Sequence, residues 1–436
     1  MSKTSMKYFA IKTLGCKVNQ SESETLAAQL QQYGLEESTG KTSNSKPDFY
    51  IINTCTVTGK AAMQSRQAIR QALKANPDAK IIVTGCYAQT DPDEIKTISG
   101  VHSVLGQNAK QHIDNIITSG DRLCAWNEEK HINIPRTASL KKTRPFLKIQ
   151  DGCNSFCTYC IVPFARGRSK SLPSEIVIEH IRQYIDAGYH ELVLTGVHLG
   201  MYGLDLYPET SLYNLLKQID NSLISQHIRI RLSSIEPREL TNNIINLVSI
   251  SDTFCKHFHI PLQSGDDHIL KRMNRPYSGS FFEKQVLKIH SLIPDAAIGA
   301  DVLIGFPGET QTAFENTFNI ISKLPIAYLH VFPFSPRKRT PAAEYPNQIR
   351  QSVIKSRCKI MRDLSMHKKR TFYASFIGKT LTALIEGKRT RSGCLKGITS
   401  NYIPVLLNGE DDLKNTLVQV NIRKLTSDLH VLATCV

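Results

Sequence analysis

Short β-type stretches alternate with amphipathic helical stretches over most of this 436-residue chain, and the alternation limits the folds open to it. We count three strand–helix units before about residue 120 and six more after residue 144. Strands that alternate with helices form parallel sheets with helices packed against them. We therefore predict an α/β protein with an N-terminal parallel-sheet domain and a central partial (β/α)6 barrel.

Each of the first three predicted strands runs into a cysteine. These strands span Tyr8–Leu14, Asp48–Asn53 and Lys80–Thr84. Ligands of parallel sheets gather at the carboxyl ends of the strands. The fold would therefore bring Cys16, Cys55 and Cys86 together, although 39 and 31 residues separate them along the chain. One such cysteine is more often a small buried hydrophobe, but the position shared by all three predicts a three-cysteine metal site.

A second, local set of three cysteines follows the first predicted barrel strand, Pro145–Gln150. Cys153, Cys157 and Cys160 are spaced C-x3-C-x2-C, with no fourth cysteine in the run. Three thiolates do not close a tetrahedral zinc site without another ligand. They suit a cubane iron–sulfur cluster that keeps one iron open for an exchangeable ligand. A structural zinc site completed by a distant ligand is the alternative interpretation.

The other barrel strands are also followed by polar loops. We predict these strands at Glu191–Thr195, Ile228–Ser233, Cys255–Ile260, Ile298–Ile304 and Ala327–Phe332. The loops TGVHLG, SSIEP and PLQSG begin where three of them end, so we expect the active site at the carboxyl-terminal face of the barrel. His198 and His259 have the chemistry of general bases, although a lone histidine beside a strand end is more often structural.

Two other stretches of the barrel region carry predictions of their own. The clearest helix is Ser174–Ala187, which Pro173 precedes. Its inward face is predicted to consist of four isoleucines, Ile176, Ile178, Ile181 and Ile185. For Arg166 and Arg168, in the sequence PFARGRSKS, two interpretations are equally good: contact with a substrate phosphate or with the linker, and a solvated loop.

The C-terminal region is basic and then changes to a β-type pattern. The chain carries a net charge of +16, and residues 337–396 hold sixteen Lys and Arg against three acids. Such a local excess is typical of a surface that binds a polyanion, with nucleic acid the first candidate. Predicted strands at Thr380–Glu386, Tyr402–Leu407 and Leu417–Leu425 indicate a small all-β barrel of a kind that binds nucleic acid.

These patterns divide the chain and suggest its compartment. We predict an N-terminal α/β domain over residues 6–120, a linker over 121–144, the barrel over 145–370 and the β domain over 371–436. The polar N-terminus has no signal-peptide pattern, and no apolar run is long enough to span a bilayer. We therefore expect a cytoplasmic protein without a membrane partner, whose eleven cysteines are reduced thiols or metal ligands.

The motifs resemble those of one family. C-x3-C-x2-C resembles the signature of radical S-adenosylmethionine (SAM) enzymes, in which the open iron binds SAM. LGCKVNQ, NTCTVT and TGCYAQ ahead of it resemble the methylthiotransferases, most of all the branch that modifies N6-threonylcarbamoyladenosine in tRNA. The C-terminal β region resembles a TRAM domain, the RNA-binding module at the end of such chains.

The resemblance implies two [4Fe–4S] clusters and SAM as cofactors. One cluster would lie on Cys153, Cys157 and Cys160, and the other on the three strand-end cysteines. Gly196, Glu236 and Gln263 would lie near SAM. No side chain is predicted to act as an acid–base catalyst, because the C2–H bond of adenine is strong and not acidic, and radical initiation is a task that proteins leave to cofactors.

The implied reaction is methylthiolation of C2 of N6-threonylcarbamoyladenosine at tRNA position 37, giving 2-methylthio-N6-threonylcarbamoyladenosine. The implied partners are tRNA, an electron-donating reductase and an iron–sulfur or sulfur donor. Methylthiolation of N6-isopentenyladenosine in tRNA or of a ribosomal-protein aspartate remains open, although the basic tail disfavours the protein substrate. A two-cluster electron carrier and a zinc-dependent RNA-binding protein are the alternatives without this catalysis.

Overall fold

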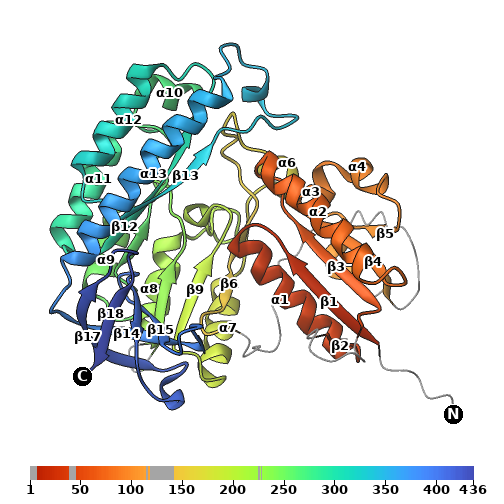
Figure 1. Ribbon diagram of the computed structural model, residues 1–436, viewed down its shortest axis with the longest axis horizontal. Coiled ribbons are helices and arrows are strands. Elements are labelled where there is room, and N and C mark those ends of the chain that lie inside the picture. Colours follow the sequence, from red (N-terminus) through yellow and green to blue (C-terminus); the bar gives the residue numbers. More distant parts are fainter. Residues whose placement is uncertain (1–6, 39–45, 114–115, 118–141, 224–225, 227) are drawn as a thin grey trace. The chain divides into compact units, whose positions relative to one another are not determined.

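The computed structural model of the protein describes residues 7–38, 46–113, 116–117, 142–223, 226 and 228–436 (Figure 1). The chain divides into two compact units. The first unit comprises residues 1–139, 146–171 and 335–343, and the second comprises residues 140–145, 172–334 and 344–436. Residues 121–141 of the predicted linker lie outside the described residues.

A parallel sheet in the order β2-β1-β3-β4-β5 is the centre of the first unit. Its strands are β1 (Tyr8–Thr13), β2 (Glu36–Glu37), β3 (Phe49–Thr54), β4 (Lys80–Gly85) and β5 (Val101–Val104). Strands β1, β3 and β4 confirm the three predicted strands. Strand β2 has only two residues and β5 reads VHSV, so neither has an apolar pattern that the sequence could reveal.

Helices cover both faces of this sheet. They are α1 (Lys17–Gln32), α2 (Gly59–Ala75), α3 (Cys86–Thr90) and α4 (Pro92–Lys96), with a 3-10 turn η1 (Ala109–His112). One apolar core joins Leu26 and Leu30 of α1 to Ile51 of β3. The other core joins Ile69 of α2 to Ile52, the next residue of β3. Successive strand residues point to opposite faces, so β3 is buried on both sides.

Residues 146–171 complete the first unit. They form β6 (Phe146–Lys148), β7 (Gln150–Asp151), α6 (Val162–Arg166) and β8 (Lys170–Ser171). Strand β6 lies against α1, and α6 lies against α3. Strands β7 and β8 pair antiparallel, with Gln150 opposite Ser171. The loop that carries Cys153, Cys157 and Cys160 therefore begins and ends at a closed pair of strands. A short turn, η3 (Pro341–Ala343), also belongs to this unit.

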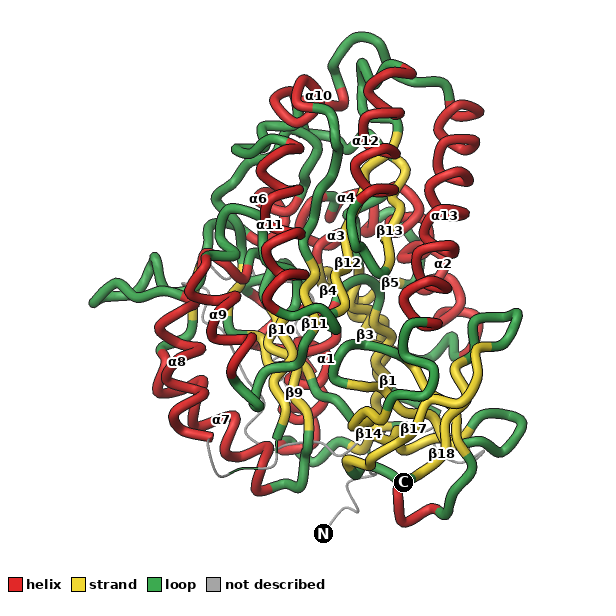
Figure 2. The backbone as a smooth tube through the Cα atoms, turned by 90° about the vertical axis from the view of Figure 1, so that its left-hand side faces the viewer, coloured by secondary structure: helices red, strands yellow, loops and turns green. Residues whose placement is uncertain are grey.

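The second unit contains five consecutive strands of β/α repeats. The strands are β9 (Glu191–Thr195), β10 (Arg229–Leu232), β11 (His257–His259), β12 (Ala297–Ile304) and β13 (Tyr328–Pro333). Strands β9 and β10 pair in parallel, as do β11, β12 and β13 (Figure 2). Helices α7 (Ser174–Asp186), α8 (Leu212–Leu223), α9 (Asn242–Ile250), α10 (Asp267–Arg272), α11 (Gly279–Leu292), α12 (Gln311–Lys323) and α13 (Gln351–Ala374) alternate with or follow them, with a turn η2 (Leu199–Met201).

The inward face predicted for helix α7 is correct at Ile181 and wrong at Ile176. Its buried residues are Val177, Ile181 and Tyr184, whereas Ile176 is exposed. The isoleucines at 176, 178, 181 and 185 span too wide an arc for one face. Spacings of four and three residues from Val177 define a narrower stripe, and that stripe is the one that packs.

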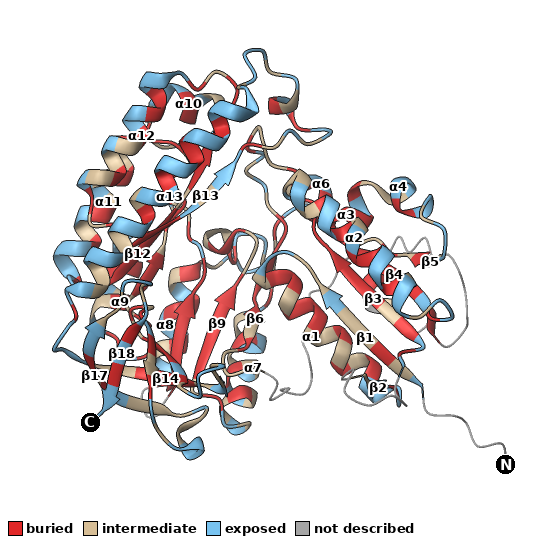
Figure 3. Cartoon of the chain, viewed as in Figure 1, coloured by how far each residue is buried: buried red, intermediate tan, exposed pale blue. Residues whose placement is uncertain are grey.

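A closed five-stranded barrel ends the chain, as predicted. Its strands are β14 (Thr380–Arg389), β15 (Leu395–Thr399), β16 (Pro404–Leu407), β17 (Leu417–Leu425) and β18 (Val431–Cys435), in the order β14-β15-β16-β18-β17, with a turn η4 (Asp411–Leu413). Ile385, Leu395 and Val420 belong to its buried apolar core. Figure 3 colours the strands of this barrel by burial. Strands β15 and β18 were not predicted.

This barrel is attached at the amino-terminal ends of β9 and β10. Arg229 donates to the carbonyl oxygens of Thr382, at 2.9 Å, and Ile398, at 3.1 Å. Arg231 donates to the carbonyl oxygen of Thr399 at 3.0 Å, and Glu191 accepts from both arginines. The small barrel therefore does not cover the carboxyl ends of these strands, which is where ligands of β/α folds bind. No helix among the described residues combines the length and hydropathy needed to cross a membrane.

Candidate metal centres and their surroundings

Cys16, Cys55 and Cys86 lie at the carboxyl ends of three neighbouring strands of the first unit. Cys16 follows β1 and is the N-cap of α1, Cys55 follows β3, and Cys86 is the first residue of α3 directly after β4. Strands β1, β3 and β4 are adjacent in the sheet, so folding brings the three residues to one edge, as the sequence predicted.

Two close approaches at this edge of the sheet involve the sulfur atoms of the cysteines. A Cβ on Gly15, whose φ is +96°, would stand 2.9 Å from the Sγ of Cys55, so glycine allows the β1 turn to approach that thiol. The side-chain amide of Gln107 donates to the Sγ of Cys86 at 3.6 Å. Hydrogen bonds to sulfur are a recognised means of tuning an iron–sulfur cluster.

Burial and mutual proximity govern the protonation of these thiols. Burial, reinforced by the neighbouring Cys86, raises the pKa of Cys55 to about 12. Burial also raises the pKa of Cys86, and Arg166 opposes it. Metal binding requires thiolates, so a metal ion must displace the protons of these two residues. Three thiols at one edge with a hydrogen-bond donor to sulfur form a suitable donor set for a soft metal centre.

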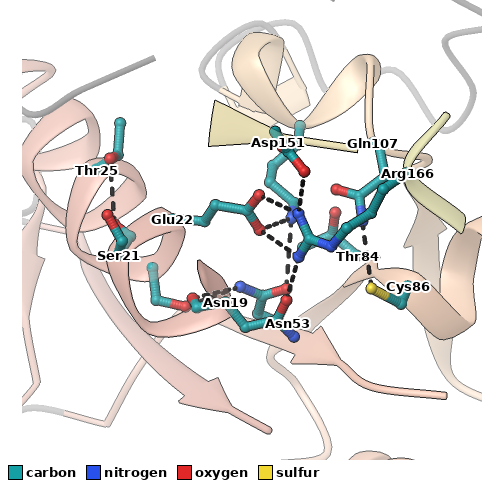
Figure 4. Close-up of polar contacts among 12 residues, drawn as sticks. Asn19, Ser21, Glu22, Thr25, Asn53, Thr84, Cys86, Gln107, Asp151 and Arg166 are labelled. Carbon is teal, nitrogen blue, oxygen red and sulfur yellow. Dashed lines mark hydrogen bonds and ion pairs between the residues drawn. The ribbon is translucent and has the colours of Figure 1, made fainter. Parts of the chain in front are cut away.

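A buried network of charges lies beside these cysteines (Figure 4). Glu22 of α1 binds Lys110 at 2.6 Å and Arg166 at 2.8 Å. It also accepts from Lys148 of β6 at 3.0 Å, and Asp151 accepts from Arg166 at 2.9 Å. All five side chains are at most 8% exposed. We call Glu22, Lys110, Lys148, Asp151 and Arg166 the charge network.

The charge network holds three cations and two anions, so it carries an excess positive charge. Burial alone would raise the pKa of Glu22, but Arg166, Lys110 and Lys148 outweigh it and hold that pKa well below its usual range. Arg166 also interacts electrostatically with Cys86 and Cys16, and these interactions help to raise its pKa. A buried positive excess stabilises thiolate ligands, because the local dielectric is low.

The local cysteine set lies on a strained loop of the same unit. Gly152 has φ +73°, and a Cβ there would stand 1.9 Å from the carbonyl oxygen of Arg168. Phe156 adopts φ +45°, which is unusual for a residue other than glycine. The backbone N–H of Ser155 donates to the Sγ of Cys153 at 3.4 Å. Cys157 is buried, whereas Cys153 and Cys160 are partly exposed.

The residues predicted to lie near SAM fall at strand ends of the second unit. Gly196 directly follows β9, Glu236 lies four residues beyond β10, and Gln263 lies four residues beyond β11. Burial raises the pKa of Glu236 although Arg275 binds its carboxylate. Gln263 has φ +64°, and its backbone N–H donates to the carbonyl oxygen of Asp301 at 2.8 Å. These positions agree with a site at the carboxyl ends of the strands.

The two histidines have different surroundings. The Nε2 of His198 lies 2.7 Å from Glu239, so this side chain is held in a hydrogen-bonded pair, as the structural interpretation predicts. His259 is not a lone histidine. It lies in contact with Asp301, which also contacts His330.

Arg166 is not a surface arginine. The solvated-loop interpretation of it is wrong, because its guanidinium is buried and donates to Glu22, Asp151 and Asn19. The sequence contained one signal of the charge network: Lys148 interrupts an otherwise apolar strand, and a lysine inside a core element requires a buried partner. Arg168 remains exposed.

The fold and the two cysteine sets define the class of the protein. Residues 8–106 match the family described as uncharacterized protein family UPF0004, and residues 147–321 match the radical SAM superfamily. Among solved structures, the radical SAM methyltransferase TsrM of Kitasatospora setae matches 78% of this chain and 74% of its own, with a TM-score of 0.57 and 13% identity. The radical SAM enzyme OxsB matches 83% and 56%, with a TM-score of 0.52 and 12% identity. The predicted fold class is thereby confirmed.

Curated relatives cover nearly the whole chain. Threonylcarbamoyladenosine tRNA methylthiotransferase MtaB of Bacillus subtilis is 38% identical over 96% of this chain and 94% of the relative. The Rickettsia prowazekii protein of that name is 37% identical over 91% of each. A tRNA-2-methylthio-N(6)-dimethylallyladenosine synthase of Clostridium botulinum is 32% identical over 96% and 95%. The chain belongs to the radical SAM methylthiotransferases, in the branch of the threonylcarbamoyladenosine tRNA methylthiotransferases.

Proposed function

We propose that this protein attaches a methylthio group to C2 of N6-threonylcarbamoyladenosine at position 37 of tRNA. The product is 2-methylthio-N6-threonylcarbamoyladenosine. The observation that carries the proposal is the presence of two three-cysteine sets on a chain whose MtaB relatives are 35–38% identical over most of its length. The cofactors of this family are two [4Fe–4S] clusters and SAM.

Each cysteine set has a separate role in the proposal. Cys153, Cys157 and Cys160 hold the cluster that binds SAM, and Cys16, Cys55 and Cys86 hold the second cluster. When bound, these groups would supply radical chemistry able to break the C2–H bond, and SAM and the second cluster would supply the methyl group and the sulfur that enter the product. Cys153 and Cys160 are partly exposed, and Gln107 donates to the Sγ of Cys86, one of the residues that would hold the second cluster.

The chain itself supplies ligands, charge and orientation. The charge network offsets the negative charge of the thiolates and ties α1, which begins beside Cys16, to the segment that carries the local set. Gly196, Glu236 and Gln263, at the strand ends of the second unit, orient SAM. No side chain acts as an acid or base on the substrate, because a C–H bond of this kind is broken by a radical and not by proton transfer.

The proposal also assigns the domains, the tRNA-binding region and the partner proteins. The domains are residues 6–120, 145–370 and 371–436, joined by a linker over 121–144. The small barrel β14–β18 and the basic stretch before it bind tRNA, since residues 337–396 have a strong excess of Lys and Arg. A reductase supplies electrons and an iron–sulfur or sulfur donor supplies sulfur, both in the cytoplasm.

Nucleoside mass spectrometry of tRNA tests the substrate. A strain without this protein should accumulate N6-threonylcarbamoyladenosine and lack its methylthio form, and the wild-type chain should restore it. The matched control is the same strain carrying the Cys55→Ala variant, which should not restore it. Persistence of the methylthio form in the deletion strain would overturn the substrate, and loss of the methylthio form of N6-dimethylallyladenosine instead would assign the chain to its 32%-identical relatives.

A further inference from the structure

Three potential metal ligands share one face of the strands β11, β12 and β13. His259 is the last residue of β11, and Asp301 and His330 are direct partners across the parallel pair β12–β13. The opposite face of these strands is apolar and buried. It consists of Phe258, Ile298, Ala300, Val302 and Leu329. The three polar residues therefore form a polar group on a rigid apolar sheet, and none of them belongs to the cysteine sets.

The spacing of the ligand atoms suits a common ion. One oxygen of Asp301, Oδ1, lies 2.9 Å from the Nε2 of His259 and 3.1 Å from the Nδ1 of His330. All three atoms lie within 4.8 Å of one another. Two ligands at about 2.1 Å from an ion and at right angles to each other are about 3 Å apart. The two short distances therefore match those between neighbouring ligands of one ion.

The orientation of His259 favours coordination over a simple ion pair. Its side chain is 10% exposed, and its Nε2 makes no aligned hydrogen bond within the described residues although the carboxylate lies 2.9 Å away. The other ring nitrogen, Nδ1, is hydrogen-bonded to the hydroxyl of Ser234. Metal-binding histidines commonly have such an outer partner, which fixes the ring and directs the second nitrogen at the ion.

The surroundings hold the group in place and leave it accessible to solvent. The ring of Tyr328 lies parallel to that of His259, with centroids 6.2 Å apart. Gly299 makes this possible, because a Cβ there would stand 2.2 Å from the tyrosine ring. His330 is 52% exposed and opens the group to solvent on its own side.

We propose that His259, Asp301 and His330 bind one divalent transition-metal ion of the Fe2+, Co2+ or Zn2+ type. Two imidazoles and one carboxylate are an established ligand set for such ions, and it leaves other positions open. The open positions lie on the side of His330, where water or an oxygen of a bound substrate completes the coordination. This inference does not depend on the proposed reaction, because it concerns ligands outside both cysteine sets.

Cobalt binding to the full-length protein with both clusters reconstituted tests the site. After equilibrium dialysis against CoCl2, cobalt and iron are counted together. We expect one cobalt per chain above the level bound by the Asp301→Asn variant, with the iron content unchanged. The cobalt K-edge absorption spectrum should show nitrogen and oxygen ligands at about 2.1 Å, two of them imidazoles, and no sulfur.

Single substitutions separate this site from adventitious binding. His330→Gln, at an exposed position that the fold does not need, should weaken cobalt binding at least about 100-fold, and Ser234→Ala about 10-fold to 100-fold. His198→Gln is the matched control, because it removes another buried histidine paired with a carboxylate, and it should leave cobalt binding unchanged.

Two results would overturn the inference. One is a wild-type protein that binds no more cobalt than Asp301→Asn, in which case the three side chains form only a chain of ion pairs. The other is cobalt that persists in His330→Gln or shows sulfur ligands, which would place it on cysteines. Iron content and the circular dichroism spectrum identify any variant that fails to fold, and the exposed His330→Gln then decides the question.

Discussion

The two cysteine sets reach the same ligand count by opposite routes. Cys153, Cys157 and Cys160 lie within eight residues, on a loop closed by β7 and β8. Cys16, Cys55 and Cys86 span 71 residues and meet because three parallel strands end at one edge. The local set therefore depends on loop geometry, and the assembled set depends on the folded sheet. Substitutions that change only the loop, only the sheet or only one ligand should therefore affect the two sets differently.

Loss of a local ligand should have the largest effect. In Cys157→Ala we expect SAM cleavage and methylthiolation to fall at least about 1000-fold, because the cluster that reduces SAM loses one of three protein ligands. The measurement is 5′-deoxyadenosine and modified tRNA by mass spectrometry after anaerobic reduction. Cys394→Ala, at a partly exposed cysteine of the small barrel outside both cysteine sets, is the control and should keep full SAM-cleavage activity.

Replacing a ligand of the assembled set should reduce methylthiolation and leave SAM cleavage nearly unchanged. In Cys55→Ala we expect methylthiolated tRNA to fall at least about 100-fold, while 5′-deoxyadenosine formation stays within about threefold of wild type. The reason is that SAM cleavage uses only the local set. Equal loss of both activities would show that the sets are not independent.

The charge network should link the two sets through stability. Glu22→Gln leaves Lys110, Lys148 and Arg166 with Asp151 as their one remaining carboxylate in the network. We expect the free energy of unfolding of the metal-free protein to fall by roughly 3–5 kcal/mol, since breaking a buried ion pair strands its partners. Denaturant titration measures it. Asp363→Asn, which removes an exposed ion pair with Lys359, should cost less than about 0.5 kcal/mol.

The effect of Glu22→Gln on the free energy of unfolding should depend on pH. The pKa of Glu22 in the folded state lies well below its ordinary value of 4.5, so its contribution is fully present above pH 4.5 and is lost as the pH falls through the lowered pKa. The difference in unfolding free energy between wild type and Glu22→Gln should therefore shrink as the pH falls below 4.5. A difference that stays constant down to pH 3 would contradict the ionised state of Glu22.

The smallest effect should come from one hydrogen bond to sulfur. Gln107→Leu removes the donor to Cys86, so the midpoint potential of the assembled cluster should fall on the order of 40 mV, which is about 1 kcal/mol for one electron. The local cluster, measured in the same redox titration, is the internal control. Movement of both potentials would show that the substitution acts on more than one cluster.

The comparison also shows what the sequence could reveal. The local set can be predicted from the spacing of its three cysteines. The assembled set could be predicted because each of its cysteines follows an apolar strand, and parallel strands end at one edge of their sheet. The charge network was missed, since its members come from α1, η1, β6, β7 and α6 and only folding pairs them. The group around Asp301 was also missed, because cross-strand register, not sequence spacing, places His330 beside it. Short strands such as β2 carry too few residues to form a pattern.

Iron and sulfide analysis of anaerobically reconstituted protein, with Mössbauer spectroscopy, tests the central claim that both sets hold a cluster. The account predicts about eight iron atoms in [4Fe–4S] clusters per wild-type chain, as resolved by the Mössbauer spectrum, and about four such atoms in either Cys55→Ala or Cys157→Ala. About four iron atoms in the wild-type chain, or zinc in place of iron at either set, would contradict it.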